Sequence, residues 1–312
     1  LDKSVVSVTE KSMLRECFTQ SKLFSRMAFS NYDQELMKWC CDTDVLPKSV
    51  EFENGFILGG SAQTGKLTSC AKSLTFCNCE FVSENALKHV LMSSSTHLAY
   101  LSMTHCRLKS MDGLSSCTQL TSLHLAGCNN ITDDSLVDGV AGLRKLHNCY
   151  LLNCNNITAR SIHAIMKCCR FLTSLHITGR FDLEEAFTGL AEPTQIDSFV
   201  AEGCQVTGLS VQLMGTLMPQ LFFSHVHASN SSVQDGDIDV LVRSCPHMFT
   251  LELTQFRSTG DASLVSMAAH SKRLHQLSLD LNGNTNVSDQ GVVGLANGIS
   301  WLTKLSIIGS QR

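Results

Sequence analysis

Five cysteines are the residues whose type and spacing most suggest chemistry. They occupy one register of a motif that recurs along the chain: Cys79, Cys106, Cys128, Cys154 and Cys204. If the motif forms neighbouring parallel strands, these thiolates would lie about 5 Å apart, close enough to share a metal ion. No Cys-x-x-Cys pair accompanies them, and recurrence at one register favours buried thiols that close each turn. We therefore expect no metal site.

A second segment, Gly60-Ser-Ala-Gln-Thr-Gly65-Lys66, has the spacing of a phosphate-binding loop. The motif requires a hydroxyl next, for magnesium, but Leu67 follows and Thr68 comes one place too late. A loop of this kind also needs its own doubly wound sheet. We expect a connecting loop here, and no nucleotide or other cofactor.

Three histidines stand at the middle, outward position of short apolar segments: His124, His176 and His225, with Tyr150 between the first two. Residues two strands apart are separated by about 10 Å, which is too far to share a metal ion. No serine or cysteine is paired with a histidine and an acid at a recognisable spacing. These residues are expected to belong to a binding face, and we predict no catalytic residues.

Composition narrows the possible classes of protein. The chain has 312 residues, of which 43% are hydrophobic and 17% charged, and this indicates a packed core. Its net charge of −4, with scattered Lys and Arg, does not favour direct nucleic-acid binding. No apolar run approaches the roughly 20 residues of a membrane-spanning helix. Fifteen cysteines, including the neighbours Cys40–Cys41 and Cys168–Cys169, indicate thiols in a reducing, intracellular compartment, either mitochondrion or cytoplasm.

An internal repeat is the strongest signal in the sequence. The pattern apolar-x-x-apolar-x-apolar begins near Ala71, Leu98, Leu120, Leu146, Leu172, Ile196, Leu221, Met248, Leu274 and Leu302. Successive copies start 22 to 28 residues apart, within the roughly 20–29 residues of leucine-rich repeats. The clearest unit spans 120–133, and the next unit repeats it closely from Leu146.

Each unit predicts one strand, one turn and one helix. Leu123 and Leu125 alternate with polar residues, so both should face the core. The Cys-Asn-Asn segment 128–130 should turn the chain, because asparagine tolerates left-handed backbone and bonds its own backbone. Helix caps are then expected at Ser83, at Thr132 or Asp133, and at Ser288.

Cysteine or asparagine eight residues after the motif start, as at Cys128 or Asn282, resembles the cysteine-containing leucine-rich repeats. This subfamily is similar to ribonuclease-inhibitor-type horseshoes and is common in F-box ubiquitin-ligase receptors and in organellar and ciliary scaffolds. The resemblance covers residues 47–312 and departs at Arg180, Ser229 and Phe256, where we expect irregular turns. It implies an α/β leucine-rich-repeat solenoid, with parallel strands on the concave face and helices on the convex face.

Residues 1–45 lie outside the repeats and predict a helical N-terminal cap or adaptor-binding segment. One apolar helical face would comprise Met13, Leu14, Phe18, Leu23, Phe24 and Met27, and a second helix would start at Asp33. Trp39-Cys40-Cys41, just before the repeats, is similar to small mitochondrial repeat proteins tied to respiratory-complex assembly. The opening Leu-Pro of an F-box is not found before these helices. The remainder, 46–312, is expected to form about ten to eleven repeats.

The repeat frame also predicts a partner surface. The outward residues most suited to protein binding are His124, Tyr150, His176, Phe223, His225 and Glu252. Hydroxyl, imidazole and aromatic groups with little charge favour a protein partner over nucleic acid or lipid. We expect a non-enzymatic interaction scaffold, a structural or assembly subunit of a larger intracellular or mitochondrial complex. The alternative is a substrate-recognition subunit of an F-box-type ubiquitin ligase.

Overall fold

One parallel sheet runs the length of the molecule. The computed structural model describes residues 26–29, 46–53, 62–79, 82–280 and 284–309. Twelve described strands pair in chain order, and all of them are parallel. The strands are β1 (Arg26–Phe29), β2 (Ser49–Glu53), β3 (Ser73–Cys77), β4 (Tyr100–Thr104), β5 (Ser122–Ala126), β6 (Asn148–Leu152), β7 (Ser174–Thr178), β8 (Ser198–Val206), β9 (Phe223–Ser231), β10 (Thr250–Thr254), β11 (Gln276–Asp280) and β12 (Lys304–Ile308).

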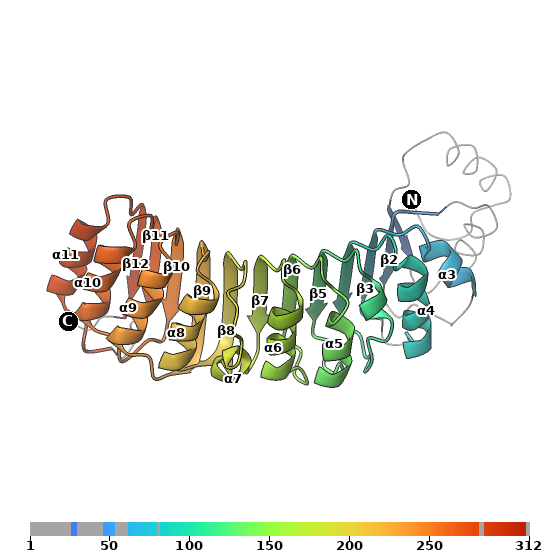
Figure 1. Cartoon of the computed structure of the whole chain (residues 1–312), viewed down its shortest axis with the longest axis horizontal. Helices are drawn as coiled ribbons and strands as arrows, with labels where there is room; N and C mark the ends of the chain where they lie inside the picture. The colour runs from blue at the N-terminus through green and yellow to red at the C-terminus, as the bar shows by residue number, and fades with distance from the viewer. Residues whose placement is uncertain (1–25, 30–45, 54–61, 80–81, 281–283, 310–312) are drawn as a thin grey trace.

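Helices follow most strands and cover one face of the sheet. They are α3 (Ala62–Thr68), α4 (Glu84–Ser94), the 3-10 helix η1 (Leu114–Ser116), α5 (Asp133–Val140), α6 (Ala159–Cys168), α7 (Leu183–Phe187), α8 (Gly208–Leu217), α9 (Asp235–Ser244), α10 (Asp261–His270) and α11 (Asp289–Gly298). The chain forms a shallow arc with strands along its inner side and helices along its outer side (Figure 1). The predicted α/β leucine-rich-repeat solenoid is confirmed.

The N-terminal end of the sheet differs from the prediction. Residues 26–29 form β1, so the expected helical face does not include Met27. Met27 and Phe29 stand in register with Val50 and Phe52, the two inward residues of β2. Pairing with a sheet edge satisfies the backbone groups of this short segment, and that outweighs its helical pattern. The sheet therefore starts before residue 46 and has more strands than the ten to eleven repeats predicted; the other expected cap residues lie outside the described part.

The core lies between the sheet and the helices. Leu123 and Leu125 are fully buried, as predicted, while the three residues that alternate with them in β5 are half-buried on the opposite face. The same alternation holds in β2, β3, β4, β6 and β11. No single unit encloses its own apolar face, so neighbouring units stabilise one another.

The recurring cysteines close the turns from inside. Cys106, Cys128 and Cys154 are buried free thiols, as predicted. Their Sγ atoms donate to strand carbonyls of the preceding unit: Cys106 to Phe76 at 3.6 Å, Cys128 to Met103 at 3.4 Å and Cys154 to Leu125 at 3.6 Å. Asn282, expected in the same slot, lies outside the described residues. Near it, the buried Asn284 amide donates to the Phe256 carbonyl at 3.1 Å and the Thr259 carbonyl at 2.6 Å.

The turns use left-handed backbone just before the Cys-Asn-Asn segment, and not at its asparagines. Gly127 and Asn153, which directly precede the cysteines, have φ of 62° and 54°, whereas residues 129 and 130 do not have positive φ. The side chain of Asn129 accepts from the backbone N–H of Asn155 in the next unit at 3.1 Å. The Cys-Asn-Asn asparagines were therefore the wrong residues for the left-handed position, although Asn153 shows that asparagine does take it in this turn. Asn129 instead links neighbouring units.

The three departures from the repeat differ from one another, and only the first is an irregular turn. After β7, Gly179 adopts a φ of 149° and Phe181, one residue beyond the expected Arg180, is buried. At the next site β9 continues through residue 231, so Ser229 lies in a strand. Phe256 fills its slot as a buried ring. An apolar ring therefore replaces the cysteine at two of these places.

Helix caps connect successive units. Thr132 and Ser83 accept from the backbone N–H groups of Ser135 and Ala86, as predicted. Ser288 stands at the N-cap of α11, but its hydroxyl donates to the Asp261 carboxylate of the preceding helix at 2.6 Å. An aspartate in the first turn of one helix can therefore accept hydrogen bonds from the N-cap residue of the next helix, and this contact stabilises both units.

The segment resembling a phosphate-binding loop is largely helical. Residues 62–65, which would have to wrap a phosphate, belong to α3 together with Lys66. The connecting loop expected here was therefore wrong for residues 62–66. A helix at this position is what the neighbouring units also contain.

Ser224 is a polar residue in a leucine position of β9. It is fully buried, it pairs in register with Phe199 and Leu251, and among the described residues its hydroxyl has no hydrogen-bond partner. A buried hydroxyl without a partner costs about 1–3 kcal/mol. We expect Ser224→Ala to raise the free energy of unfolding by about 1 kcal/mol in urea titrations.

A matched serine provides the control. Ser161 is also fully buried, but its hydroxyl donates to the Asp133 carboxylate at 2.5 Å. Ser161→Ala should therefore destabilise the protein by about 1–2 kcal/mol, because it removes a hydrogen bond to a charged group. If both substitutions changed stability in the same direction, the assignment of Ser224 would be wrong.

Candidate protein-binding face

The predicted partner residues form one row across the exposed face of the sheet. Strand pairing places His124 beside Tyr150 and Tyr150 beside His176. The row continues through Val200 and His225 to Glu252. All six side chains are half-buried, and each is the third residue of its strand. Five of the six predicted residues therefore lie in one unbroken row, and we call these six positions the concave row.

Rings on the first part of this face are in contact. The His124 and Tyr150 ring centroids are 4.1 Å apart with the rings stacked, and Tyr150 meets His176 edge-on at 4.6 Å. Tyr100, from the first position of β4, extends the chain of rings, 5.1 Å from His124. Adjacent aromatic groups on neighbouring strands stabilise the sheet and hold each ring in a fixed orientation. The face therefore presents a preordered surface.

The two histidines in this part of the row have lowered pKa values. Burial lowers the pKa of His124 below its usual value, and the nearby His176 lowers it further. Burial also lowers the pKa of His176, opposed by the charge of Glu202. Since an ordinary imidazole titrates near 6.5, a lowered pKa leaves both rings mostly uncharged at pH 7. The first half of the concave row therefore offers hydrogen bonds and ring surface rather than charge.

The other end of the concave row carries a polar pair. Nδ1 of His225 lies 2.6 Å from Oε2 of Glu252, and both side chains are about one quarter exposed. Such a pair can fix an imidazole tautomer. Among the described residues, no group of three or more His, Cys, Asp or Glu side chains is placed to hold a metal ion.

Phe223 is separate from the row. It begins β9 and aligns with Ser198 and Thr250 at the first strand position, where it is half-buried. It therefore borders the concave row from one side. Sequence reasoning missed Val200, which lies between His176 and His225, and Tyr100. The repeat frame beginning at Ile196 and Leu98 could have found both, because each falls at an outward strand position.

Comparison with known proteins supports the fold. A family model described as leucine-rich repeats in two copies matches residues 96–139. An internalin from Listeria monocytogenes is similar in structure, with 11% identity and a TM-score of 0.54, over 96% of this chain and 94% of that one. Internalin C2 of the same bacterium has 17% identity and a TM-score of 0.50, over 69% and 83% of the two chains.

A structure of the yeast Rad7 and Elc1 complex also matches, with 17% identity and a TM-score of 0.47, over 97% of this chain and 87% of that chain. No curated protein sequence gave a match. The fold is that of a leucine-rich-repeat solenoid, and the family model places two such repeats within residues 96–139. In its described part, no helix has the length and apolar character needed to cross a membrane.

Proposed function

We propose that this chain is a non-enzymatic protein-interaction scaffold that holds its partner on the concave row. One observation carries the proposal: ordered, mostly uncharged side chains project in register from six neighbouring strands. Extended concave sheets of repeat proteins are suited to large partners. Tyr150 is the central anchor, because aromatic residues dominate the energetics of interfaces.

The scaffold fits best as a structural or assembly subunit of a larger complex in a reducing compartment, mitochondrion or cytoplasm. Buried free thiols such as Cys106, Cys128 and Cys154 support a reducing environment. A subunit of a complex would also use faces other than the sheet, and exposed aromatic residues lie at its edge, as at Phe222 and Trp301.

Quantitative affinity purification tests this proposal. Tagged full-length protein is compared with Tyr150→Ala and Phe223→Ala, and bound proteins are measured by mass spectrometry. We expect Tyr150→Ala to reduce capture of the main partner at least tenfold, because truncating an anchor costs about 2 kcal/mol or more. Phe223→Ala, at the border of the row, should have a smaller effect.

The control is Met92→Ala, which truncates an exposed apolar side chain on α4, away from both the sheet face and the sheet edge. Circular dichroism melting curves must show that each variant is folded. If Tyr150→Ala and Phe223→Ala both fold and keep every partner, the proposed binding face is wrong. A different result would identify a substrate-recognition subunit of a ubiquitin ligase. In that case residues 1–45 would capture an F-box adaptor, and the concave substitutions would remove only the captured substrate protein.

A further inference from the structure

A ladder of stacked rings lies at the edge of the sheet where strands β9 to β12 begin. Phe222, Phe249 and His275 each directly precede a strand, and backbone bonds of 2.8 and 2.9 Å join neighbours in this series. Their ring centroids are 4.9 and 4.2 Å apart, and Trp301 follows 6.2 Å from His275. We call these four residues the aromatic rim. Phe222 and Trp301 are 50% and 66% exposed, unusual values for large apolar side chains.

Neighbouring rings of the aromatic rim face one another, so their edges point away from the stack. Successive interplanar angles are 12°, 16° and 23°, so the rings stack along the length of the solenoid. The faces between neighbours are thus covered, which leaves little room for a planar base to insert. Ring edges carry the positive part of the aromatic quadrupole, so this surface favours apolar groups and carboxylates.

Cationic groups reinforce that preference. A hollow of about 520 Å³ beside the aromatic rim is also lined by Lys272, Arg273 and His247, and no described carboxylate lines it. The Lys272 ammonium is held by the Ala268 carbonyl at 2.6 Å, and Arg273 lies 3.2 Å from the His247 ring. A positive group fixed beside an apolar surface recognises an acidic and apolar ligand.

The hollow continues along the sheet edge. A neighbouring hollow of about 700 Å³ shares Phe222 and His247 with it, and a third of about 450 Å³ shares residues 193–195 with the second. Asp197 lines the second hollow and Glu192 the third, beside Lys167 and Arg170, so the unopposed positive charge lies at the end formed by Lys272 and Arg273. Together they follow the edge from β7 to β12, five steps of about 4.8 Å, or about 24 Å. An extended peptide of about seven residues has that length.

We propose that the aromatic rim and this groove bind an extended acidic segment of another protein, with apolar side chains on the rings and a carboxylate at Arg273. The site is distinct from the concave row, because its residues precede the strands and do not lie within them. It gives the scaffold a second, independent contact.

The test uses a fluorescent octapeptide that alternates Glu with Leu and Phe, and a matched peptide with Lys in place of Glu. Trp39→Phe makes Trp301 the only tryptophan of the chain, so its emission reports binding directly. We expect saturable binding of the acidic peptide, a change in Trp301 emission, and at least tenfold weaker binding of the lysine peptide. Arg273→Glu should weaken the acidic peptide at least tenfold.

Arg144→Glu is the matched control, since it makes the same change in net charge at an exposed arginine outside the groove. It should leave the affinity within twofold of the parent, and so should Tyr150→Ala on the concave row. Equal binding of the two peptides, an unchanged affinity in Arg273→Glu, or no binding at millimolar peptide would overturn the proposal. The parent protein could instead self-associate and bind neither peptide, and Trp301→Ser could abolish that self-association. This result would assign the groove to a second copy of the chain.

Discussion

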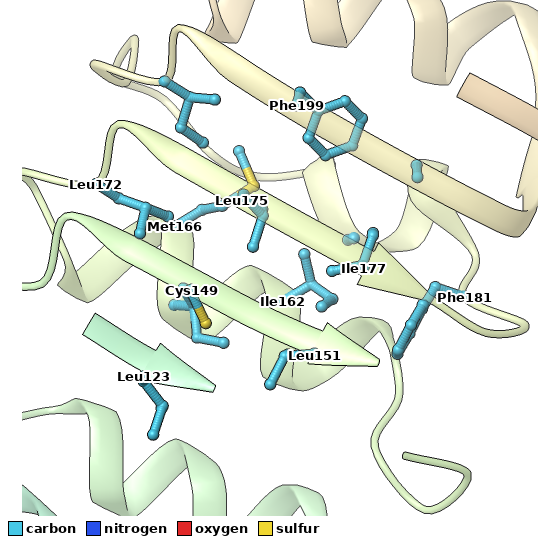
Figure 2. Close-up of a cluster of buried hydrophobic side chains, with 14 of the residues drawn as sticks. Leu123, Cys149, Leu151, Ile162, Met166, Leu172, Leu175, Ile177, Phe181 and Phe199 are labelled. Carbon is cyan, nitrogen blue, oxygen red and sulfur yellow. The ribbon is translucent and has the colours of Figure 1, made fainter. Parts of the chain in front are cut away.

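Replacing Phe199 by alanine is expected to lower the free energy of unfolding by about 3–5 kcal/mol, the largest single effect predicted for this core. The ring of Phe199 is fully buried behind β8, and its centroid lies 6.0 Å from that of Phe187 in an edge-on arrangement. Figure 2 shows it next to Leu175 of β7, with Leu151 of β6 one strand further away. Alanine would leave a cavity at the irregular β7–β8 junction, where α7 has only five residues.

Urea denaturation followed by circular dichroism measures this loss. Val200→Ala is the control, because it shortens the next residue of the same strand on the opposite, half-buried face. We expect the control to cost less than about 1 kcal/mol. The substitution could also lower the dependence of the unfolding free energy on urea concentration, together with the urea concentration at the midpoint. That result would indicate that the solenoid unfolds as two cooperative blocks that separate at β8. Equal losses for the two variants would contradict the assignment of Phe199 to the core.

The second large effect concerns thiol reactivity. Burial raises the pKa of Cys117 and of Cys245 to about 12. At pH 8 a thiol of that pKa is ionised to about one part in 10⁴, compared with roughly a quarter for an ordinary thiol near 8.5. Cys70 is exposed. We expect iodoacetamide at pH 8 to label Cys70 at least 10³ times faster than Cys117 or Cys245 in the folded protein.

Peptide mass spectrometry over a time course gives the rate at each cysteine. The same reaction in 8 M urea is the control, because unfolding removes the burial and all three thiols should then react at similar rates. Rapid labelling of Cys117 under native conditions, at a rate near that of Cys70, would show that the inner turns are open to solvent. It would also contradict the assignment of these thiols to the packed core.

Much of the architecture was predictable from local patterns. The spacing of apolar residues predicted the parallel sheet and the inward positions of Leu123 and Leu125. Thr132 and Ser83 were predictable as caps, because their side chains satisfy backbone N–H groups within the same turn. The outward residues of the concave row followed from the two-residue period of a strand. These features depend on neighbours within one repeat, which the sequence contains in order.

Tertiary structure decided the features that involve two units at once. Met27 lies in a strand because β2 offers an edge, and no local pattern records that. Asn129 bonds Asn155, and the Ser288 hydroxyl bonds Asp261, because stacking brings successive turns and caps together. The aromatic rim arises in the same way: single residues some 26 apart become a stack only when strand spacing aligns them. Sequence periodicity determines which way each side chain points, whereas the register between units determines what it meets.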